Sequence, residues 1–223
     1  MKSKRGLRRK VKTSQKKNWI GRNYGRENCA SFSFRKEYAE IFGFLKECKH
    51  FIYSVILVFF GFALLGFAFP APEVVSEAIL DFLEQLMKEI EGLSYFGLFS
   101  YIFFNNLKAS FLGMVLGVFF GLFPILFALF NGYVLGFVSS KVVSSESFFA
   151  LFNLLPHGIF ELPAVFISLG LGVRLGALIF ENRRQKENFK ELFLNCLKTF
   201  VLVVIPLLLI AAIIEASFMV FGG

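Results

Sequence analysis

Residues 51–69 constrain the fold of this chain more than any other feature, because they are nineteen consecutive residues, FIYSVILVFFGFALLGFAF, without a charged side chain. About 20 apolar residues, at a rise of about 1.5 Å each, cross the hydrocarbon core of a bilayer as a helix. Pro70 and Pro72 follow this stretch and disfavour continuation of the helix. We therefore predict a transmembrane helix at 51–69.

Four further apolar stretches predict additional spans. Residues 95–140 are 46 mostly apolar residues, enough for two spans, and Pro124 favours a break between them. Pro156 and Pro163 interrupt the next stretch, whereas Pro206 predicts a kink in the last one. With 56% hydrophobic residues and 33 Phe, the chain carries more apolar surface than a soluble core of this size can bury. The predicted spans are 51–69, 96–122, 124–140, 148–175 and 199–221.

Charge is distributed unevenly around these spans. Residues 1–49 carry fifteen Lys and Arg against four Glu, whereas residues 70–94 carry six carboxylates against Lys88 alone. Because Lys and Arg that flank membrane segments remain in the cytoplasm, we expect the N-terminus inside and, after five crossings, the C-terminus outside. The connection between the fourth and fifth spans then returns to the cytoplasm, and its basic residues are Arg183, Arg184, Lys186, Lys190 and Lys198. The predicted localisation is that of a multi-pass protein of the cell membrane.

The same patterns predict the domain organisation. Residues 1–35 are predicted to be a basic, disordered cytoplasmic tail that binds anionic lipid headgroups, and we do not expect nucleic acid as a partner. Residues 36–49 are predicted to form a cytoplasmic juxtamembrane amphipathic helix, and residues 50–223 the transmembrane helical domain. Residues 73–92 place apolar side chains near helical spacing but carry seven charges, so we expect an extracytoplasmic amphipathic helix and not a sixth span. The predicted fold class is all-α, a polytopic transmembrane helix bundle with a broken fourth span.

The fourth predicted span carries a histidine and a carboxylate, His157 and Glu161. Ionisable side chains are rare at membrane depth and mark structural or functional sites. Residues four apart share one side of a helix, and Pro156 is suited to a helix start, where Asn153 could cap it. Amides on neighbouring spans also need partners in lipid and complete the predicted intramembrane polar site: Asn131, Asn105 and Asn106. The residues that we expect to break helices are Pro124, Pro156, Gly158 and Pro163.

Three interpretations of the pair remain open. His157 and Glu161 could satisfy each other and lock a broken helix, or they could form a proton- or ion-linked site, because a histidine beside a carboxylate is suited to proton exchange. A metal site is the weakest interpretation, since the only other histidine in the chain is His50. The cysteines lack metal-binding spacing, and they are Cys29, Cys48 and Cys196. We therefore predict no catalytic residue, no metal and no cofactor.

Glycines recur at four-residue spacing, a pattern that lets helix backbones approach closely. They are Gly113, Gly117, Gly121, Gly132, Gly136, Gly172 and Gly176. We expect them to pack helices within one bundle, and a homo-oligomer seam is the alternative. Lys108 lies near the middle of its span if that span runs over 96–122, but at its outer boundary if 95–104 is a re-entrant helix. Glu215 is expected to reach the outer interface.

Several of these motifs together resemble the stage II sporulation protein M family in its archaeal branch. They are Asn105 to Ser110 (NNLKAS), Gly117 to Pro124, Asn131-Gly132 and Leu155 to Ala164 (LPHGIFELPA). The resemblance covers about residues 50–220. It implies a multispanning membrane protein without established catalytic activity, which in spore-forming bacteria is a partner of peptidoglycan-remodelling proteins during engulfment.

Two functions from different classes follow. The first is a non-catalytic scaffold that organises or recruits membrane and envelope-remodelling proteins, as the resemblance implies. The second is a transporter or channel with a proton- or ion-linked site at His157 and Glu161, because discontinuous spans with polar residues form binding sites in carriers. Whether these residues face a wet cavity or a dry interior distinguishes the two functions.

Overall fold

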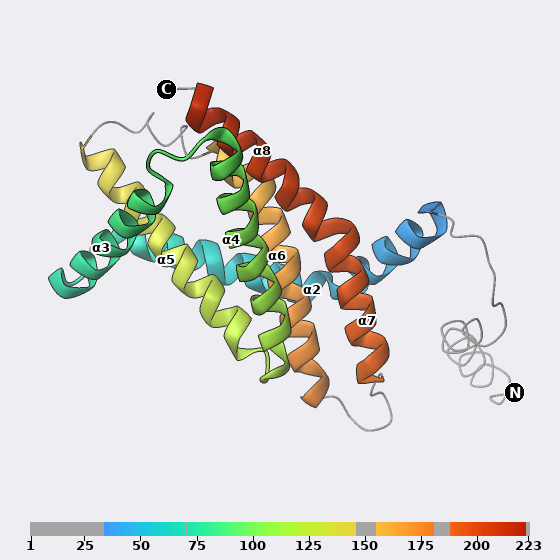
Figure 1. The fold of residues 1–223 in the computed structure, drawn as a ribbon. Helices are drawn as coiled ribbons and strands as arrows, with labels where there is room; N and C mark the ends of the chain where they lie inside the picture. Colours follow the sequence, from blue (N-terminus) through green and yellow to red (C-terminus); the bar gives the residue numbers. More distant parts are fainter. Residues whose placement is uncertain (1–33, 70, 146–154, 181–187, 222–223) are drawn as a thin grey trace, which may run out of the picture. The chain divides into compact units, whose positions relative to one another are not determined.

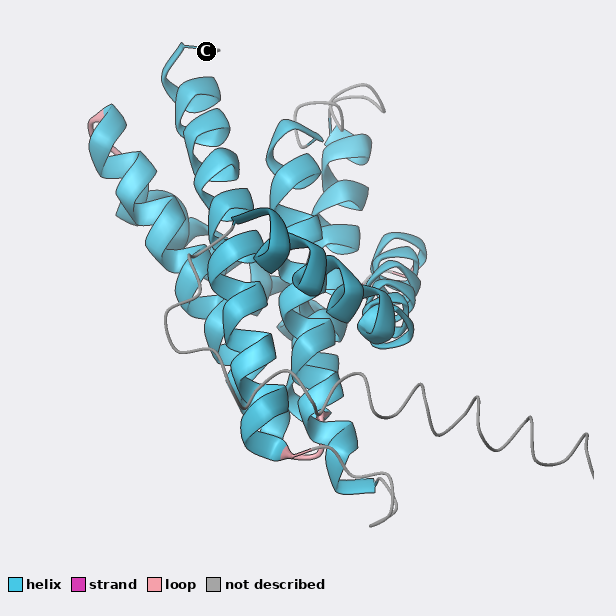
Figure 2. Cartoon of the chain, turned by 90° about the vertical axis from the view of Figure 1, so that its right-hand side faces the viewer, coloured by secondary structure: helices cyan, strands magenta, loops and turns pink. Residues whose placement is uncertain are grey.

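The computed structural model describes residues 34–69, 71–145, 155–180 and 188–221, with the backbone alone for residues 34, 145 and 155–160. The chain divides into two units, Met1–Glu37 and Tyr38–Gly223, and the helical bundle belongs to the second unit. Each regular element of the described chain is a helix (Figure 2). The predicted all-α class is therefore confirmed.

Five stretches of the described chain are long and apolar enough to cross a membrane, and they are Arg35–Ala68, Tyr95–Val118, Leu122–Ser144, Glu161–Phe180 and Phe189–Phe221. In chain order the helices (Figure 1) are α2 (Phe34–Ala68), α3 (Glu73–Ile90), α4 (Tyr95–Val115), the 3-10 turn η1 (Leu116–Val118), α5 (Leu122–Ser145), α6 (Leu155–Ala177), the 3-10 turn η3 (Leu178–Phe180), α7 (Phe189–Thr199), the π-helical segment η4 (Phe200–Val204) and α8 (Ile205–Phe221).

The helix that carries the first predicted span begins before that span. The juxtamembrane helix expected at 36–49 and the span expected at 51–69 are one helix, α2. No proline interrupts this segment, and its buried stripe continues from Ile41 through Cys48 to Val55 and Phe59. A continuous apolar stripe at helical spacing keeps one helix packed on the bundle along its length.

The break between the second and third spans lies slightly before its predicted position. The chain turns at Phe119 to Gly121, where Phe120 has φ 58° and Gly121 has φ 69°. Glycine adopts this left-handed conformation without the steric cost that a side chain brings. Pro124 lies in the first turn of α5, where its missing N–H costs no helical hydrogen bond.

The prediction that Pro163 breaks the fourth span is wrong. Helix α6 begins at Leu155, beside Pro156, and continues through Pro163 to Ala177. Membrane helices tolerate an internal proline because neighbouring groups and local adjustments satisfy the carbonyl that loses its partner. Gly158 lies within the first turns of α6, so it does not break the helix either. Residues 148–154 of the predicted span lie outside the described residues.

The last span is a single long stretch in which Pro206 changes the helix type without ending it. The π-helical segment η4 ends at Val204, and Pro206 is the second residue of the following helix, α8. A proline cannot donate to the carbonyl four residues before it, which here is that of Leu202. The hydroxyl of Tyr38, on α2, donates to this carbonyl oxygen at 3.4 Å. The predicted kink is therefore a π-helical segment.

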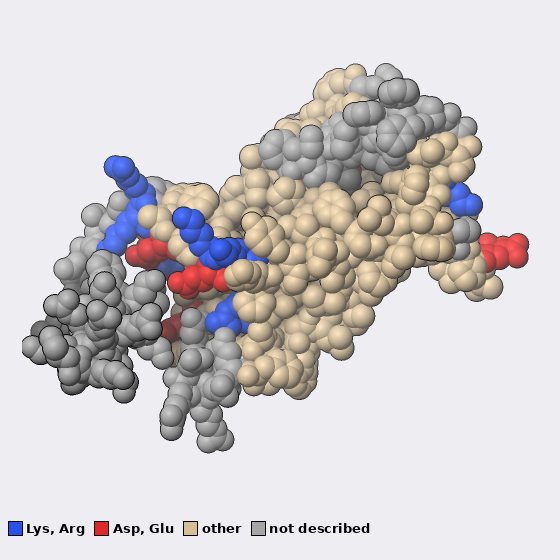
Figure 3. Space-filling view, turned by 180° about the vertical axis from the view of Figure 1, so that it is seen from behind, with Lys and Arg blue, Asp and Glu red and all other residues tan. Residues whose placement is uncertain are grey.

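Helix α6 is the central helix of the bundle. In its most apolar stretch 56% of the residues are buried, against 17 to 33% in the other four spans. It packs against α4, α5 and α8, and α4 lies in front of it in Figure 1. Figure 3 shows a broad uncharged surface on one face of the molecule, with charged side chains toward its ends. This pattern is typical of a bundle whose lateral surface faces lipid.

Glycines bring α6 into backbone contact with α4 and α2. A Cβ atom at Gly172 would lie 2.7 Å from the carbonyl oxygen of Gly113, and one at Gly170 would lie 2.8 Å from Cα of Ile52. These distances are shorter than van der Waals contact, so a larger residue would force the helices apart. Further close backbone contacts join α6 to the segment that follows α4, and they involve Gly117, Gly121 and Gly176.

A second glycine seam joins α5 to α2. A Cβ atom at Gly132 would meet the backbone of Phe59, and one at Gly136 would lie 2.9 Å from the amide nitrogen of Phe67. The glycine patterns of the third span thus contact helix α2 of the same chain. This is the intramolecular packing that their spacing favours.

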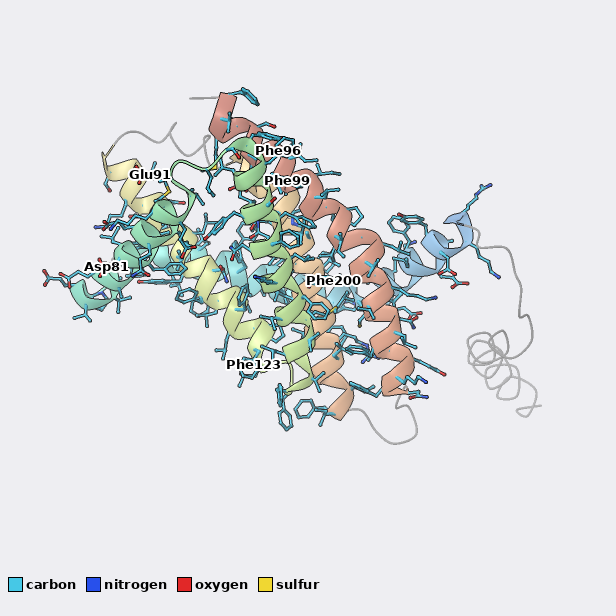
Figure 4. All side chains as sticks on the ribbon, in the orientation of Figure 1. Asp81, Glu91, Phe96, Phe99, Phe123 and Phe200 are labelled. Atoms are coloured by element: carbon cyan, nitrogen blue, oxygen red, sulfur yellow. The ribbon has the colours of Figure 1, made fainter. Side chains whose placement is uncertain are left out.

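Helix α3 is amphipathic and connects the first two spans. Only Ile79 is fully buried in it, whereas acidic residues such as Asp81 and Glu91 extend from it (Figure 4). The hydroxyl of Tyr101, on α4, donates to a carboxylate oxygen of Glu89 at 2.5 Å and holds the end of α3 on the bundle. The helix expected at 73–92 is therefore confirmed, and the side of the membrane on which it lies remains a prediction.

Candidate functional site

The candidate polar site lies in the first turns of α6. His157 and Glu161 are four residues apart on this helix, so they share one side of it. Glu161 is half-buried, and one of its carboxylate oxygens is completely buried. The side chain of His157, like the expected cap Asn153, lies outside the described residues. Glu161 is thus a half-buried carboxylate in the first turns of α6, and its pairing with His157 stays a prediction.

The side of α6 that carries Glu161 faces α8. Residues that follow it at helical spacing, Ala164 and Leu171, belong to one buried cluster together with Val204 and Leu208 of η4 and α8. The cluster is apolar, so the part of α6 that follows Glu161 packs on α8 through apolar side chains.

A second carboxylate, Glu215, lies on the facing side of α8. It follows Leu208 by seven residues, or two helical turns, and therefore shares the side of α8 that packs on α6. It is half-buried, and one of its oxygens is completely buried, so it does not simply extend to the outer interface as expected. Since α6 begins at the end of the bundle where α8 finishes (Figure 1), Glu161 and Glu215 lie in the same half of the molecule.

Sequence reasoning missed Glu215 as a site residue because the position of an acid near the end of an apolar stretch is equally typical of an interfacial residue. The seven-residue spacing between Leu208 and Glu215 indicates that the two share one side of α8. Only the packing of α8 against α6 identifies that side as the buried one.

The contribution of the asparagines to this site stays a prediction. The side-chain amide of Asn131 donates to the carbonyl oxygen of Phe127, in its own helix, at 2.8 Å. Asn105 is exposed and Asn106 is half-buried on α4. Among the described residues, no hydrogen bond joins these three amides to α6. An asparagine can satisfy its amide within one turn of its own helix, so its presence in a span does not require an interhelical partner.

The structure decides the open question about Lys108. Helix α4 begins at Tyr95 and is continuous through residues 95–104, so this segment belongs to the span and is not a re-entrant helix. Lys108 therefore lies in the middle part of the span, and its side chain is exposed.

A buried hydrogen bond joins α4 and α6. The hydroxyl of Ser168 donates to the carbonyl oxygen of Ser110 at 2.6 Å, and both side chains are fully buried. The hydroxyl of Ser110 has no hydrogen-bond partner among the described residues. Interhelical serine bonds stabilise membrane bundles modestly, by about 0.6 kcal/mol on average. We assign this contact to packing.

No group of three or more His, Cys, Asp or Glu side chains that could hold a metal ion occurs among the described residues. Cys48 and Cys196 are buried in the same apolar cluster as Leu192, and Cys29 lies outside the described residues. Buried cysteines in apolar surroundings behave as small hydrophobic side chains.

Comparison with known proteins agrees with this architecture. The family model described as stage II sporulation protein M matches residues 55–218, which include all five spans in whole or in part. An uncharacterized protein of Methanocaldococcus jannaschii, MJ0793, is 32% identical over 122 residues, a match that covers 52% of this chain and 68% of that protein. No solved structure matches the chain.

Proposed function

Because the chain belongs to the stage II sporulation protein M family, we propose that it is a non-catalytic membrane scaffold that recruits or organises membrane and envelope-remodelling proteins. The close packing of its central helix carries this proposal. Gly172 and Gly170 hold the backbone of α6 against those of α4 and α2. Carriers operate by rocking one group of helices against another, and backbone contacts on two sides of the helix that bears the polar site oppose such movement.

The orientation that we propose follows from charge. The basic residues before α2 and around α7 lie in the cytoplasm by the rule for flanking Lys and Arg, and the acidic helix α3 lies outside. A scaffold in this orientation has a basic inner end that attracts anionic headgroups and an acidic outer helix available to envelope proteins.

A proton- or ion-linked transporter is the second candidate. The observation that favours it is the burial of one oxygen in each of Glu161 and Glu215 on facing helices. Intramembrane carboxylates are a common component of proton relays. In this alternative His157 and Glu161 would exchange protons with Glu215, and the protein would move an ion or solute across the membrane.

Substitution of Glu161 distinguishes the two candidates. In a scaffold, Glu161→Gln should preserve stability because an amide can still form hydrogen bonds, whereas Glu161→Leu should leave its partner unsatisfied and cost about 1–3 kcal/mol. Thermal unfolding in detergent measures both effects. Proteoliposomes with an internal pH-sensitive dye provide the second measurement, and the wild-type protein should show no proton flux above that of empty liposomes.

A proton flux in wild-type proteoliposomes that Glu161→Gln abolishes, with stability unchanged, would contradict the scaffold and establish the transporter. Equal tolerance of Gln and Leu in stability, without flux in any variant, would show that Glu161 contributes to neither function.

A further inference from the structure

Helix α4 presents a charged residue to the lateral surface of the bundle at membrane depth. Lys108 is exposed, and it lies in the span Tyr95–Val118. At a rise of about 1.5 Å per residue its Cα is roughly 20 Å from the start of this span and roughly 15 Å from its end. The four-carbon stem of a lysine does not reach across either distance, so snorkelling does not bring the ammonium group to water.

The residues around Lys108 form one exposed face of α4. Positions three and four residues away on a helix lie on the same side. These neighbours are all exposed, and they include an amide as well as large apolar side chains: Phe104, Asn105, Phe111 and Leu112. We call these five residues the α4 face.

Neighbouring elements border the α4 face but do not cover it. On one side the ring of Phe200, in η4, meets the ring of Phe111 edge-on, with centroids 5.4 Å apart (Figure 4). Toward the start of the helix, Tyr101 binds α3 through Glu89. Among the described residues, Lys108 has no hydrogen bond or ion pair.

Exposure of such a face to lipid is unfavourable. A lysine at the centre of a membrane helix costs about 2.5–3.5 kcal/mol on insertion scales, and intramembrane charges almost always pair or face a polar interior. The amide of Asn105, one turn away, also needs a partner where water is absent. Within the described part of the chain, a cation and an amide are therefore unsatisfied on one helix face.

We propose that the α4 face binds a transmembrane helix of a partner protein that carries an Asp or Glu at mid-depth. The carboxylate would pair with the ammonium group of Lys108, Asn105 would donate or accept a further hydrogen bond, and the apolar side chains would pack around them. This inference rests on the proposed scaffold function and names the class of partner that the scaffold recruits.

A second copy of this chain does not fit the face. Oligomers with two-fold symmetry place the same surface against itself, so Lys108 would meet Lys108 of the other copy. The two carboxylates described in the later spans, Glu161 and Glu215, are half-buried, and each has one completely buried oxygen. They are therefore directed into the bundle of their own chain.

Association with synthetic helices tests the proposal. The full-length protein, labelled with a donor dye, is reconstituted in phosphatidylcholine liposomes with acceptor-labelled, leucine-rich single-span peptides that carry either Glu or Gln at the centre. Energy transfer should show about tenfold tighter association of the Glu peptide, the ratio expected of an intramembrane interaction of about 1–2 kcal/mol. Lys108→Gln should abolish this preference, and Lys108→Arg should retain it.

A matched control is Leu64→Gln, which adds an amide to the surface of α2 at a residue that is 70% exposed. This variant should keep the preference for the Glu peptide. Equal association of the two peptides with the wild-type protein, or a Glu preference that persists in Lys108→Gln, would overturn the proposal. So would transfer between two labelled copies of the protein that Lys108→Gln abolishes, because this would identify self-association. The scaffold function is tested by the proton-flux measurement, whereas these experiments test only the α4 face. The two proposals can therefore fail independently.

Discussion

Replacement of Gly172 by Ala should separate the two central helices of the bundle. The new Cβ atom would lie 2.7 Å from the carbonyl oxygen of Gly113 and 3.1 Å from Cα of Met114. Both atoms belong to the backbone of α4, so no side-chain rotation relieves the contact and the helices must move apart by several tenths of an ångström. Overpacking of this kind costs typically about 1–3 kcal/mol.

Gly61→Ala is the matched control, because a Cβ atom at Gly61 would find nothing within 4 Å. In a helix interior alanine is more favourable than glycine by up to about 1 kcal/mol, so this control should be neutral or stabilising. Reversible unfolding in mixed detergent micelles, followed by circular dichroism, measures both variants. If Gly172→Ala is as stable as Gly61→Ala, then the α4–α6 seam is not closely packed and the argument from it against a moving α6 is lost.

Further predictions concern orientation and interhelical bonds. Single cysteines at Glu84 and Gln185, in a background without native cysteines, should react with impermeant maleimide from opposite sides of the membrane, and labelling from one side would contradict five crossings. Ser168→Ala should cost about 0.6 kcal/mol by removing the bond to the carbonyl of Ser110, and an unchanged unfolding midpoint would show that the bond contributes nothing. Tyr101→Phe should release α3 from α4, and limited proteolysis should then cleave α3 faster while the bundle stays intact. An unaltered rate of cleavage would show that this hydrogen bond does not hold α3 on the bundle.

The candidate site was only partly predictable from the sequence. The position of Glu161 in a span, and the start of a helix beside Pro156, depend on local properties: the length of an apolar run and the missing N–H of a proline. The roles of Glu215 and Lys108 depend on which side of each helix meets a neighbour. In spans that are apolar all round, the hydrophobic pattern does not identify the buried side, because lipid and protein interior are equally apolar.

The sequence alone establishes the fold class and the five apolar spans, since helices of sufficient apolar length satisfy every backbone group within a bilayer. It also determined that glycines would form helix contacts, but not which helices they join. Tertiary structure alone decided that Gly172 meets α4, that Gly132 meets α2, and that α6 continues through Pro163 at the centre of the bundle. The physical reason is that close packing depends on the pairing of whole helices, which no local sequence signal specifies.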